Sequence, residues 1–293
     1  MVRLEGLKSQ PFLPGPARGV HHHSPITIHT SPMTMRFSTS IIRATLLILT
    51  STLLNSPTQA NAYWTKVSLR IEGPDTTIFE STINTAGGIV TTLAGGTHMC
   101  DGTNNGAESK PCATITSAIN DAVFTWDGTW YKRYQDYLIT SIGGSSPVPN
   151  KYWGLFIGYK YAMMGGCQSK VKEDDKVLVA FDASETSTLL ESSASPLSLP
   201  SGQSVKFKVV DGRRRSVVQG AKVTTNGGPW GTTDDNGEVT LVFDKAGVYK
   251  YKATKDGAIR SNAVTITVTA AGGGDGQAAQ TVYVYDAGFR GCN

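Results

Sequence analysis

Histidine is almost absent from most of this chain, and charged residues are sparse. Four of the five histidines, His21, His22, His23 and His29, lie near the N-terminus, and His98 is the only later one. A site built from several histidines, such as a multi-histidine zinc centre, is therefore excluded for the chain after residue 62. Charged residues make up 17% of the chain, which also has 32 glycines. This composition disfavours long charged helices and favours a turn-rich β protein.

The positive charge of the chain is confined to its first residues. The formal net charge is +4, but five of the 27 basic residues and one of the 23 acidic residues precede Tyr63, which leaves 22 of each sign. A body without net charge lacks the electrostatic footprint of a nucleic-acid-binding protein. We interpret the one basic run, Arg213-Arg214-Arg215, as a solvated loop. No nucleic-acid partner is therefore expected.

The N-terminal region has the pattern of a targeting signal. A basic stretch begins at Met35, a mainly apolar run covers 44–54, and Ala60-Asn61-Ala62 matches a cleavage motif. The apolar run is far shorter than the ~20 residues that span a bilayer. We therefore predict cleavage between Ala62 and Tyr63, a secreted mature chain, and no transmembrane anchor in it. The corresponding ranges are a non-structural upstream extension over 1–34 and a signal peptide over 35–62.

The pattern over 63–183 predicts strands and one helix. Lys66–Glu72 alternates apolar and polar residues, as a half-buried strand does, and Thr77–Ile83 returns after a turn. A helix is expected after a cap at Thr114, because apolar residues then recur at i, i+3, i+4 and i+7. One amphipathic helix against a mixed sheet makes an α+β domain. Further strands are expected at 89–93, 137–142, 152–157 and 176–182.

The remainder of the chain predicts a linker, a second domain and a tail. The serine-rich composition of 184–201 favours a linker. Short alternating segments between turn signals then favour a small all-β sandwich over 202–270. A Gly-rich spacer and C-terminal tail occupy 271–293, with one more alternating segment at 281–285. The sandwich strands are expected at 205–210, 221–225, 238–243, 248–254 and 264–268.

Several motifs, taken in order, resemble known families. The first five are VSLRIEGPDTTIFE, HMCDGTNNGAESKPCATITSAINDA, FTWDGTWYKRYQDYLITSIG, YWGLFIGYKY and GGCQSKVKEDDKVLVAFDA. Together they resemble the DUF4430 family, the domain also found at the C-terminus of transcobalamin and intrinsic factor, over about 66–183. This resemblance implies a β-grasp-like fold. Residues 196–269, through TTDDNGEVTLVF, AGVYKYKAT and IRSNAVTITV, resemble a bacterial-type Ig-like domain.

Two departures limit what the resemblance implies. The family usually has a Gly-Asp turn before its last strand, where this chain has Glu173-Asp174-Asp175. Aspartate tolerates left-handed backbone geometry better than most residues, so we expect the turn to persist. The sequence shows no counterpart of the helical domain that grips cobalamin in transcobalamin. No cofactor is therefore expected, since cobalamin would rest on the resemblance alone.

The four cysteines, Cys100, Cys112, Cys167 and Cys292, are expected to form disulfides. An even number of cysteines in a secreted chain favours this interpretation. A reactive thiolate needs a base, for which only His98 is available, and a four-thiolate zinc site needs close pairs that the chain lacks. Cys100 could close a local loop with Cys112 or pair with Cys167, and a partner within the first domain is favoured for Cys167. Cys292 would then pair with the leftover cysteine or with another chain.

Nine tryptophans and tyrosines crowd into 126–161. They could form a platform that stacks on a planar molecule or a glycan, or they could be the ordinary packing of a small domain, which we favour. The resemblance singles out Tyr152 and Trp153, because that strand faces the ligand-bearing side in the relative. The candidate ligand-binding residues are Tyr152, Trp153, Tyr159 and Trp130.

Carboxylates offer an alternative chemistry. Six carboxylates could suggest glycosidase chemistry, but nothing in the sequence fixes two of them at a defined separation, and solvated loops are the better account. They are Asp101, Asp127, Asp136, Glu173, Asp174 and Asp175. The segment 101–105 could bind calcium weakly but lacks EF-hand spacing, so no metal site is expected. We predict a secreted, non-enzymatic module that binds a small molecule or glycan. The alternatives are a structural or adhesive cell-surface protein without a small ligand, and an unrecognised carboxylate-dependent hydrolase.

Overall fold

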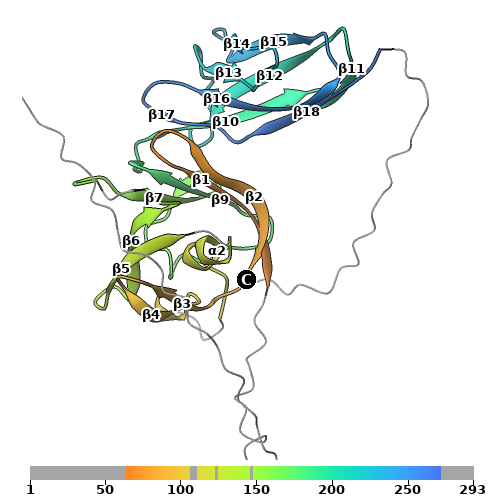
Figure 1. Cartoon of the computed structure of the whole chain (residues 1–293). Helices are drawn as coiled ribbons and strands as arrows, with labels where there is room; N and C mark the ends of the chain where they lie inside the picture. Colours follow the sequence, from red (N-terminus) through yellow and green to blue (C-terminus); the bar gives the residue numbers. More distant parts are fainter. Residues whose placement is uncertain (1–63, 106–110, 123–124, 146–147, 272–293) are drawn as a thin grey trace, which may run out of the picture. The chain divides into compact units, whose positions relative to one another are not determined.

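A computed structural model describes residues 64–105, 111–122, 125–145 and 148–271 (Figure 1). The chain divides into two units, 1–58 and 59–293, and every described residue belongs to the second. These residues are mostly β-strand, with one short α-helix among them. No helix of this part of the chain is long and apolar enough to cross a membrane. The predictions for the upstream extension, the signal peptide, its cleavage at Ala62 and Tyr63, Cys292 and the strand at 281–285 lie outside the described residues.

A five-stranded mixed sheet forms the first module. Its strand order is β2-β1-β9-β7-β8. The central strands β1 and β9 are parallel, and their outer neighbours β2 and β7 run antiparallel to them. The predicted hairpin of the first two strands is confirmed. The bounds are β1 Thr65–Glu72, β2 Thr77–Thr85, β7 Trp153–Ile157, β8 Lys160–Tyr161 and β9 Lys176–Phe181.

The helix α2 (Ile115–Asp121) packs on one face of this sheet. It begins where predicted, because Thr114 and Ser117 form a capping box in which each side chain accepts from the backbone amide of the other. The helix packs against every second residue of β1. The shared core includes Val67, Leu69, Ile71, Ile115, Ala118 and Ile119, all of which are buried.

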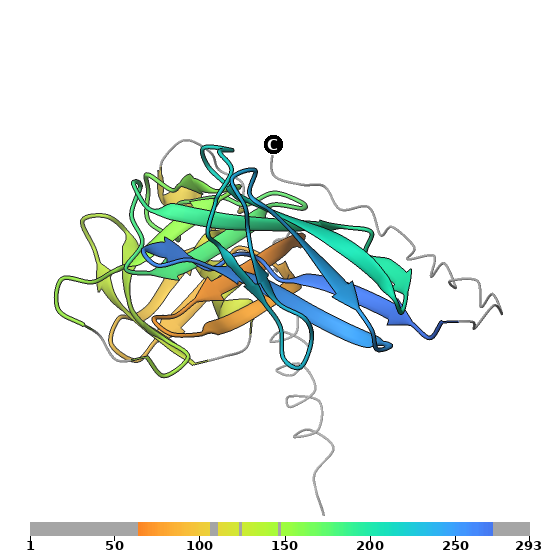
Figure 2. The same ribbon diagram turned by 90° about the horizontal axis from the view of Figure 1, so that it is seen from above.

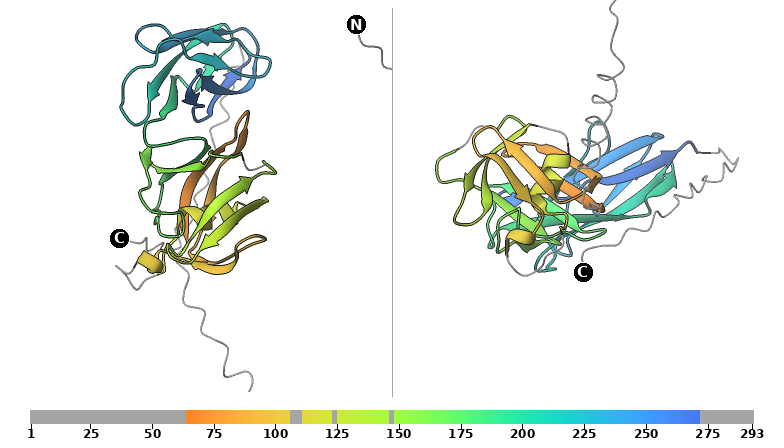
Figure 3. Two further views of the ribbon diagram at one scale, coloured as in Figure 1. Left: turned by 90° about the vertical axis from the view of Figure 1, so that its left-hand side faces the viewer. Right: turned by 90° about the horizontal axis from the view of Figure 1, so that it is seen from below.

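Two hairpins complete the first module (Figure 3, orange to yellow-green). One pairs β3 (Gly88–Thr92) with β4 (Gly96–Cys100), which η1 (Thr103–Asn105) follows, and the other pairs β5 (Trp126–Tyr131) with β6 (Asp136–Ile142). A disulfide joins Cys100 at the end of β4 to Cys167 in the loop before β9. The favoured pairing within the first domain is thus confirmed, and the local Cys100–Cys112 alternative is wrong. Cys112 is also disulfide-bonded.

The second module is a β-sandwich (Figure 2, teal to blue). Its sheets have the orders β15-β12-β10-β17 and β11-β18-β16-β13-β14. Buried side chains from both sheets, including Phe207, Phe243, Tyr251 and Ile266, form its core. All five predicted strands are found. The bounds are β10 Thr188–Ser195, β11 Ser198–Pro200, β12 Gln203–Asp211, β13 Lys222–Thr224, β14 Gly231–Thr232, β15 Glu238–Phe243, β16 Gly247–Thr254, β17 Ala258–Ile259 and β18 Val264–Thr269.

The serine-rich linker predicted over 184–201 is wrong for most of its length. Strand β10 pairs with β12 along six residues, and β11 pairs with β18. Leu189 and Leu190 of β10 are fully buried, in two different apolar clusters. Serine content suggested a linker, but a backbone ladder and two buried leucines are enough to hold this segment in the sheet.

Side chains on the other face of the first sheet contact the second module. Phe156, Tyr159 and Leu178 share an apolar cluster with Leu189, and Ile259 packs against it. Arg70 and Glu72, which alternate with the apolar residues of β1, are 6% and 1% exposed. From Leu69 to Glu72, the half-buried strand expected from the sequence is therefore covered on both faces, whereas Lys66 and Ser68 remain exposed.

Candidate functional site

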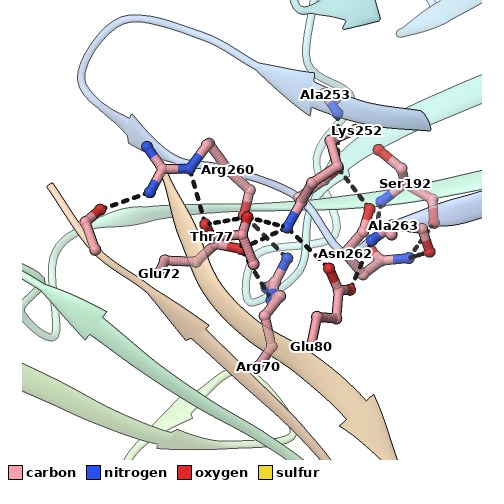
Figure 4. A network of polar contacts seen from close by, with 12 residues as sticks. Arg70, Glu72, Thr77, Glu80, Ser192, Lys252, Ala253, Arg260, Asn262 and Ala263 are labelled. Carbon is pink, nitrogen blue, oxygen red and sulfur yellow. Dashed lines mark hydrogen bonds and ion pairs between the residues drawn. The ribbon is translucent and has the colours of Figure 1, made fainter. Parts of the chain in front are cut away.

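A network of charged side chains joins the two modules (Figure 4). At its centre, the Glu72 carboxylate accepts from Lys252 Nζ at 2.7 Å and from Arg260 Nε at 2.8 Å. The Thr77 hydroxyl donates to the same carboxylate at 2.9 Å. A buried carboxylate is costly unless it is both paired and hydrogen-bonded. These three donors therefore supply the pairing and hydrogen bonds that a buried carboxylate at Glu72 requires.

Lys252 bridges Glu72 to a second carboxylate. Its ammonium lies 2.9 Å from Glu80 Oε2, and Glu80 Oε1 accepts from the Ala263 amide at 2.6 Å. Arg260 also donates from Nη2 to the carbonyl of Thr76 at 2.9 Å, in the turn between β1 and β2. The turn before β2 and the middle of β2 are thus held by groups of the second module (Figure 4).

Beside this network lies a cleft of about 470 Å³. Its walls come from β1, β2 and β9 of the first module and from β16 and the start of β18 in the second. Small-molecule sites commonly measure roughly 300–1,000 Å³. The lining carries many polar side chains: Ser68, Arg70, Glu80, Ser81, Thr82, Tyr159, Lys176, Lys250, Asn262 and Thr265.

Arg70 and Tyr159 are the buried polar residues of the cleft. The Arg70 guanidinium carbon lies 5.9 Å from the centroid of the Tyr159 ring, and its Nη1 donates to the Arg260 carbonyl at 2.9 Å. Tyr159 is 7% exposed, and burial raises the pKa of its hydroxyl to about 12 although Arg70 opposes the shift. That hydroxyl is therefore neutral at physiological pH and can donate a hydrogen bond.

Cations outnumber carboxylates around the cleft. Glu191 pairs with Lys176 at 3.0 Å and with Arg215, while Glu72 and Glu80 are taken up by the network. Lys250 makes no ion pair within the described part of the chain. In total, six cations surround three carboxylates, an excess of three positive charges. The cations are Arg70, Lys176, Arg215, Lys250, Lys252 and Arg260.

The four aromatic residues predicted to bind a ligand do not come together. Trp153 is 8% exposed and packs edge-on against Phe181 in the core that includes α2. Tyr152 is 57% exposed, and Trp130 stacks on His98 with 3.8 Å between ring centroids. Of the four, only Tyr159 lines the cleft. These aromatic residues therefore do not form one shared platform, and Trp153 and Trp130 pack as the favoured interpretation, ordinary packing, implies.

The residues considered for catalysis have structural partners. Cys100 is bonded to Cys167, so neither is a free nucleophile. Asp127 accepts from the amides of Ala94 and Gly128 at 3.0 and 2.8 Å. Asp136 lies opposite Tyr131 in the β5–β6 ladder, and Tyr131 is four positions beyond Asp127. The backbones at Asp127 and Asp136 are therefore separated by roughly 13 Å along the strands, at ~3.3 Å per residue. Their carboxylates also bind different segments, Asp127 the Ala94 amide and Asp136 the Cys167 amide.

Asp136 is a buried acceptor beside the disulfide. Its carboxylate accepts from the amides of Tyr137 at 2.8 Å and Cys167 at 3.1 Å. Burial raises the pKa of Asp136 to about 6, and these amides only partly offset that effect. Asp101, in the segment considered for calcium, accepts from the amide and hydroxyl of Thr103. The described residues contain no group of three His, Cys, Asp or Glu placed to hold a metal ion.

Sequence reasoning missed Arg70, Glu72 and Lys252. The contacts of Lys252 with Glu72 and Glu80 join residues 180 and 172 positions apart, and no local pattern reports such pairs. No local signal marks Arg70 and Glu72 either, because they occupy the polar positions of an alternating strand.

Comparisons with known proteins add little. No family model matches the chain, and no curated protein matches it. Among solved structures, the chain is similar to the D00-D0 domain of intimin, with 15% identity and a TM-score of 0.19. That similarity covers 64% of this chain and 90% of the other. At this TM-score, it assigns neither a fold nor a function.

Proposed function

We propose that this protein is a secreted, non-enzymatic binding protein whose two modules hold a small ligand in the cleft between them. In this proposal the first module is a β-grasp-like domain of the DUF4430 type, and the second is an Ig-like sandwich. The observation that carries the binding function is the cleft itself. It combines a suitable volume with two buried polar residues, Arg70 and Tyr159, and an excess of positive charge.

The topology of the first module supports the β-grasp-like assignment. A parallel central pair, β1 and β9, lies between antiparallel neighbours, and α2 packs on one face. The turn before β9 has Asp174 at φ 63°, the left-handed geometry that the resemblance required of an aspartate. Secretion is supported by the Cys100–Cys167 disulfide, because such bonds persist mainly in oxidising compartments.

The test is native mass spectrometry of the protein secreted by its own host and kept unreduced. The proposal predicts a species heavier than the chain from Tyr63 by a discrete mass that acid releases. Thr82→Trp fills the cleft from an exposed position on β2, opposite Ser68 and on the same face of the sheet as Arg70, and should abolish the added mass. Ser204→Trp adds the same bulk at an exposed position on β12, outside the cleft lining, and should retain it. A bare chain mass in the wild type would contradict the proposal.

A second candidate function is adhesion without a small ligand. Around the β5–β6 turn, Tyr131, Tyr134, Met163 and Met164 are exposed and line a separate hollow. Exposed apolar clusters of this kind are typical of contact surfaces for other macromolecules. If the secreted protein carries no added mass, this surface becomes the leading candidate. Loss of cell-surface binding in Tyr134→Ser, with Tyr152→Ser as the exposed control, would then support adhesion.

A further inference from the structure

We propose that the cleft binds a sugar acid, a small polyhydroxylated molecule whose carboxylate is held by Arg70 and Lys250. This inference rests on the proposed binding function and specifies the class of ligand. Two observations support it. Arg70 and Lys250 have N–H donors that no group of the described chain accepts from, and the Tyr159 ring is covered by other residues.

Arg70 presents uncommitted donors in a fixed position. A guanidinium has five N–H donors in a planar arrangement that matches a carboxylate. Within the described residues, the Arg70 side chain makes one hydrogen bond, to the Arg260 carbonyl, and its Nε lies 3.9 Å from Glu72, beyond hydrogen-bonding distance. The Tyr159 ring and the surrounding burial restrict its rotation. A preorganised guanidinium of this kind favours bidentate binding of a carboxylate.

The carboxylates of the chain do not compete for these donors. Glu72 accepts from Lys252, Arg260 and Thr77, and Glu80 accepts from Lys252 and the Ala263 amide. Lys250 lines the cleft and has no ion pair within the described residues. An anion that enters the cleft therefore meets uncompensated positive charge from Arg70 and Lys250, which a neutral ligand does not use.

The remaining lining favours hydroxyl groups over apolar ones. Ser68, Thr82 and Thr265 contribute hydroxyls to the lining, and the neutral Tyr159 hydroxyl can donate. The Tyr159 ring is enclosed, because a Cβ on Gly212 would lie 2.5 Å from it and Arg70 lies over it. Stacking on this ring is therefore unavailable to a ligand. Recognition must come from hydrogen bonds and charge, which suits a sugar acid better than a neutral sugar or a planar aromatic molecule.

Isothermal titration of the mature chain tests the inference, with sodium glucuronate, glucose, inorganic phosphate and a diuronide at matched ionic strength. We expect glucuronate to bind at least tenfold more tightly than glucose. The diuronide distinguishes the source of the ligand: tighter binding indicates the end of a polysaccharide, and weaker binding a free sugar acid. Equal binding of glucose and glucuronate, or phosphate binding as tight as glucuronate, would overturn the sugar-acid assignment.

Variants locate the binding. Lys250→Gln should weaken glucuronate binding roughly tenfold or more, because it removes a charge-assisted contact. Lys245→Gln makes the same charge change at an exposed lysine outside the cleft lining and should leave binding unchanged. Arg70→Lys keeps the charge and loses the planar donor pair, so it should weaken glucuronate more than phosphate. Because Arg70 is buried, the Arg70→Lys result is interpreted only if the variant keeps the wild-type melting temperature. Lys250 is exposed, so Lys250→Gln should fold normally and is sufficient to test the inference.

Wild-type-like affinity in Lys250→Gln would overturn the assignment of the carboxylate to this end of the cleft. Failure of the inference and failure of the proposed function are distinguishable. If mass spectrometry of the secreted protein shows a ligand that Thr82→Trp removes, while glucuronate does not bind, only the ligand class is wrong.

Discussion

Replacing Lys252 by methionine should destabilise the protein far more than its surface position suggests. The side chain of Lys252 is 19% exposed and its ammonium contacts two carboxylates, Glu72 at 2.7 Å and Glu80 at 2.9 Å. Methionine keeps most of the aliphatic volume and removes the charge. Glu72 would then remain buried with one cation fewer.

The magnitude follows from the burial of Glu72. Removing one partner of a buried ion pair costs about 3–5 kcal/mol, because an uncompensated charge stays in the interior. Glu72 keeps Arg260 and the Thr77 hydroxyl, which places the expected loss at the lower end, about 3 kcal/mol. For a unit of this size, each kcal/mol lowers the melting temperature by about 2–4 °C, so a fall of roughly 6–12 °C is expected.

The assay is urea unfolding followed by circular dichroism and tryptophan fluorescence, with Lys206→Met as the matched control. Lys206 pairs with Glu238 at a similar distance, 3.0 Å, but its side chain is 61% exposed. Exposed pairs contribute about 0–1 kcal/mol, so this variant should be nearly neutral. If Lys252→Met lowers the free energy of unfolding no more than Lys206→Met, the network does not stabilise the junction of the modules and our reasoning about it is wrong.

Three further outcomes are expected. Replacing Cys100 and Cys167 together by serine should lower the free energy of unfolding by about 4 kcal/mol, because the bond closes a loop of 67 residues, and an unchanged urea midpoint would contradict this. Because burial raises the pKa of Asp136 from 3.8 to about 6, the folded state binds this proton more tightly than the unfolded state. Stability from this group should therefore rise by up to about 3 kcal/mol as pH falls from 6 to 4, and Asp136→Asn should remove that slope. Gly212→Ala should cost about 1–3 kcal/mol, since its Cβ would lie 2.5 Å from the Tyr159 ring, and a neutral effect would show that the ring can move.

Local patterns predicted much of the fold. The alternation in β1 and β2, the cap at Thr114, and the short strands of the sandwich all carry their information within about ten residues. Such features depend on backbone geometry and on which face of an element is apolar. Sequence therefore located them without knowledge of the partners.

Strand β10 escaped prediction because its stabilising partners are distant. Its serines resemble a linker in composition, and only its ladder with β12 and the burial of Leu189 and Leu190 reveal a strand. The network around Glu72 escaped for the same reason. Arg70 and Glu72 alternate with apolar residues, so their face resembled a solvent face until the second module covered it.

The aromatic residues were misleading because their density says nothing about where their rings lie. Trp153 and Trp130 are close in sequence, yet one packs beneath the sheet with α2 and the other stacks on His98 beside the hairpins. Tyr159 lines the cleft from the turn after β7, where its backbone has left-handed geometry with φ 64°. No periodic pattern predicts such a turn for a tyrosine.

The most direct test of the cleft as a binding site is an NMR titration. The low-mass fraction that acid releases from the host-secreted protein would be added to isotopically labelled mature chain, and amide chemical shifts followed. We predict shifts concentrated at Ser68, Ser81 and Thr265, which line the cleft from three strands. Shifts concentrated instead at Tyr134 and Met163, around the β5–β6 turn, would contradict the account and place the binding surface on the other hollow.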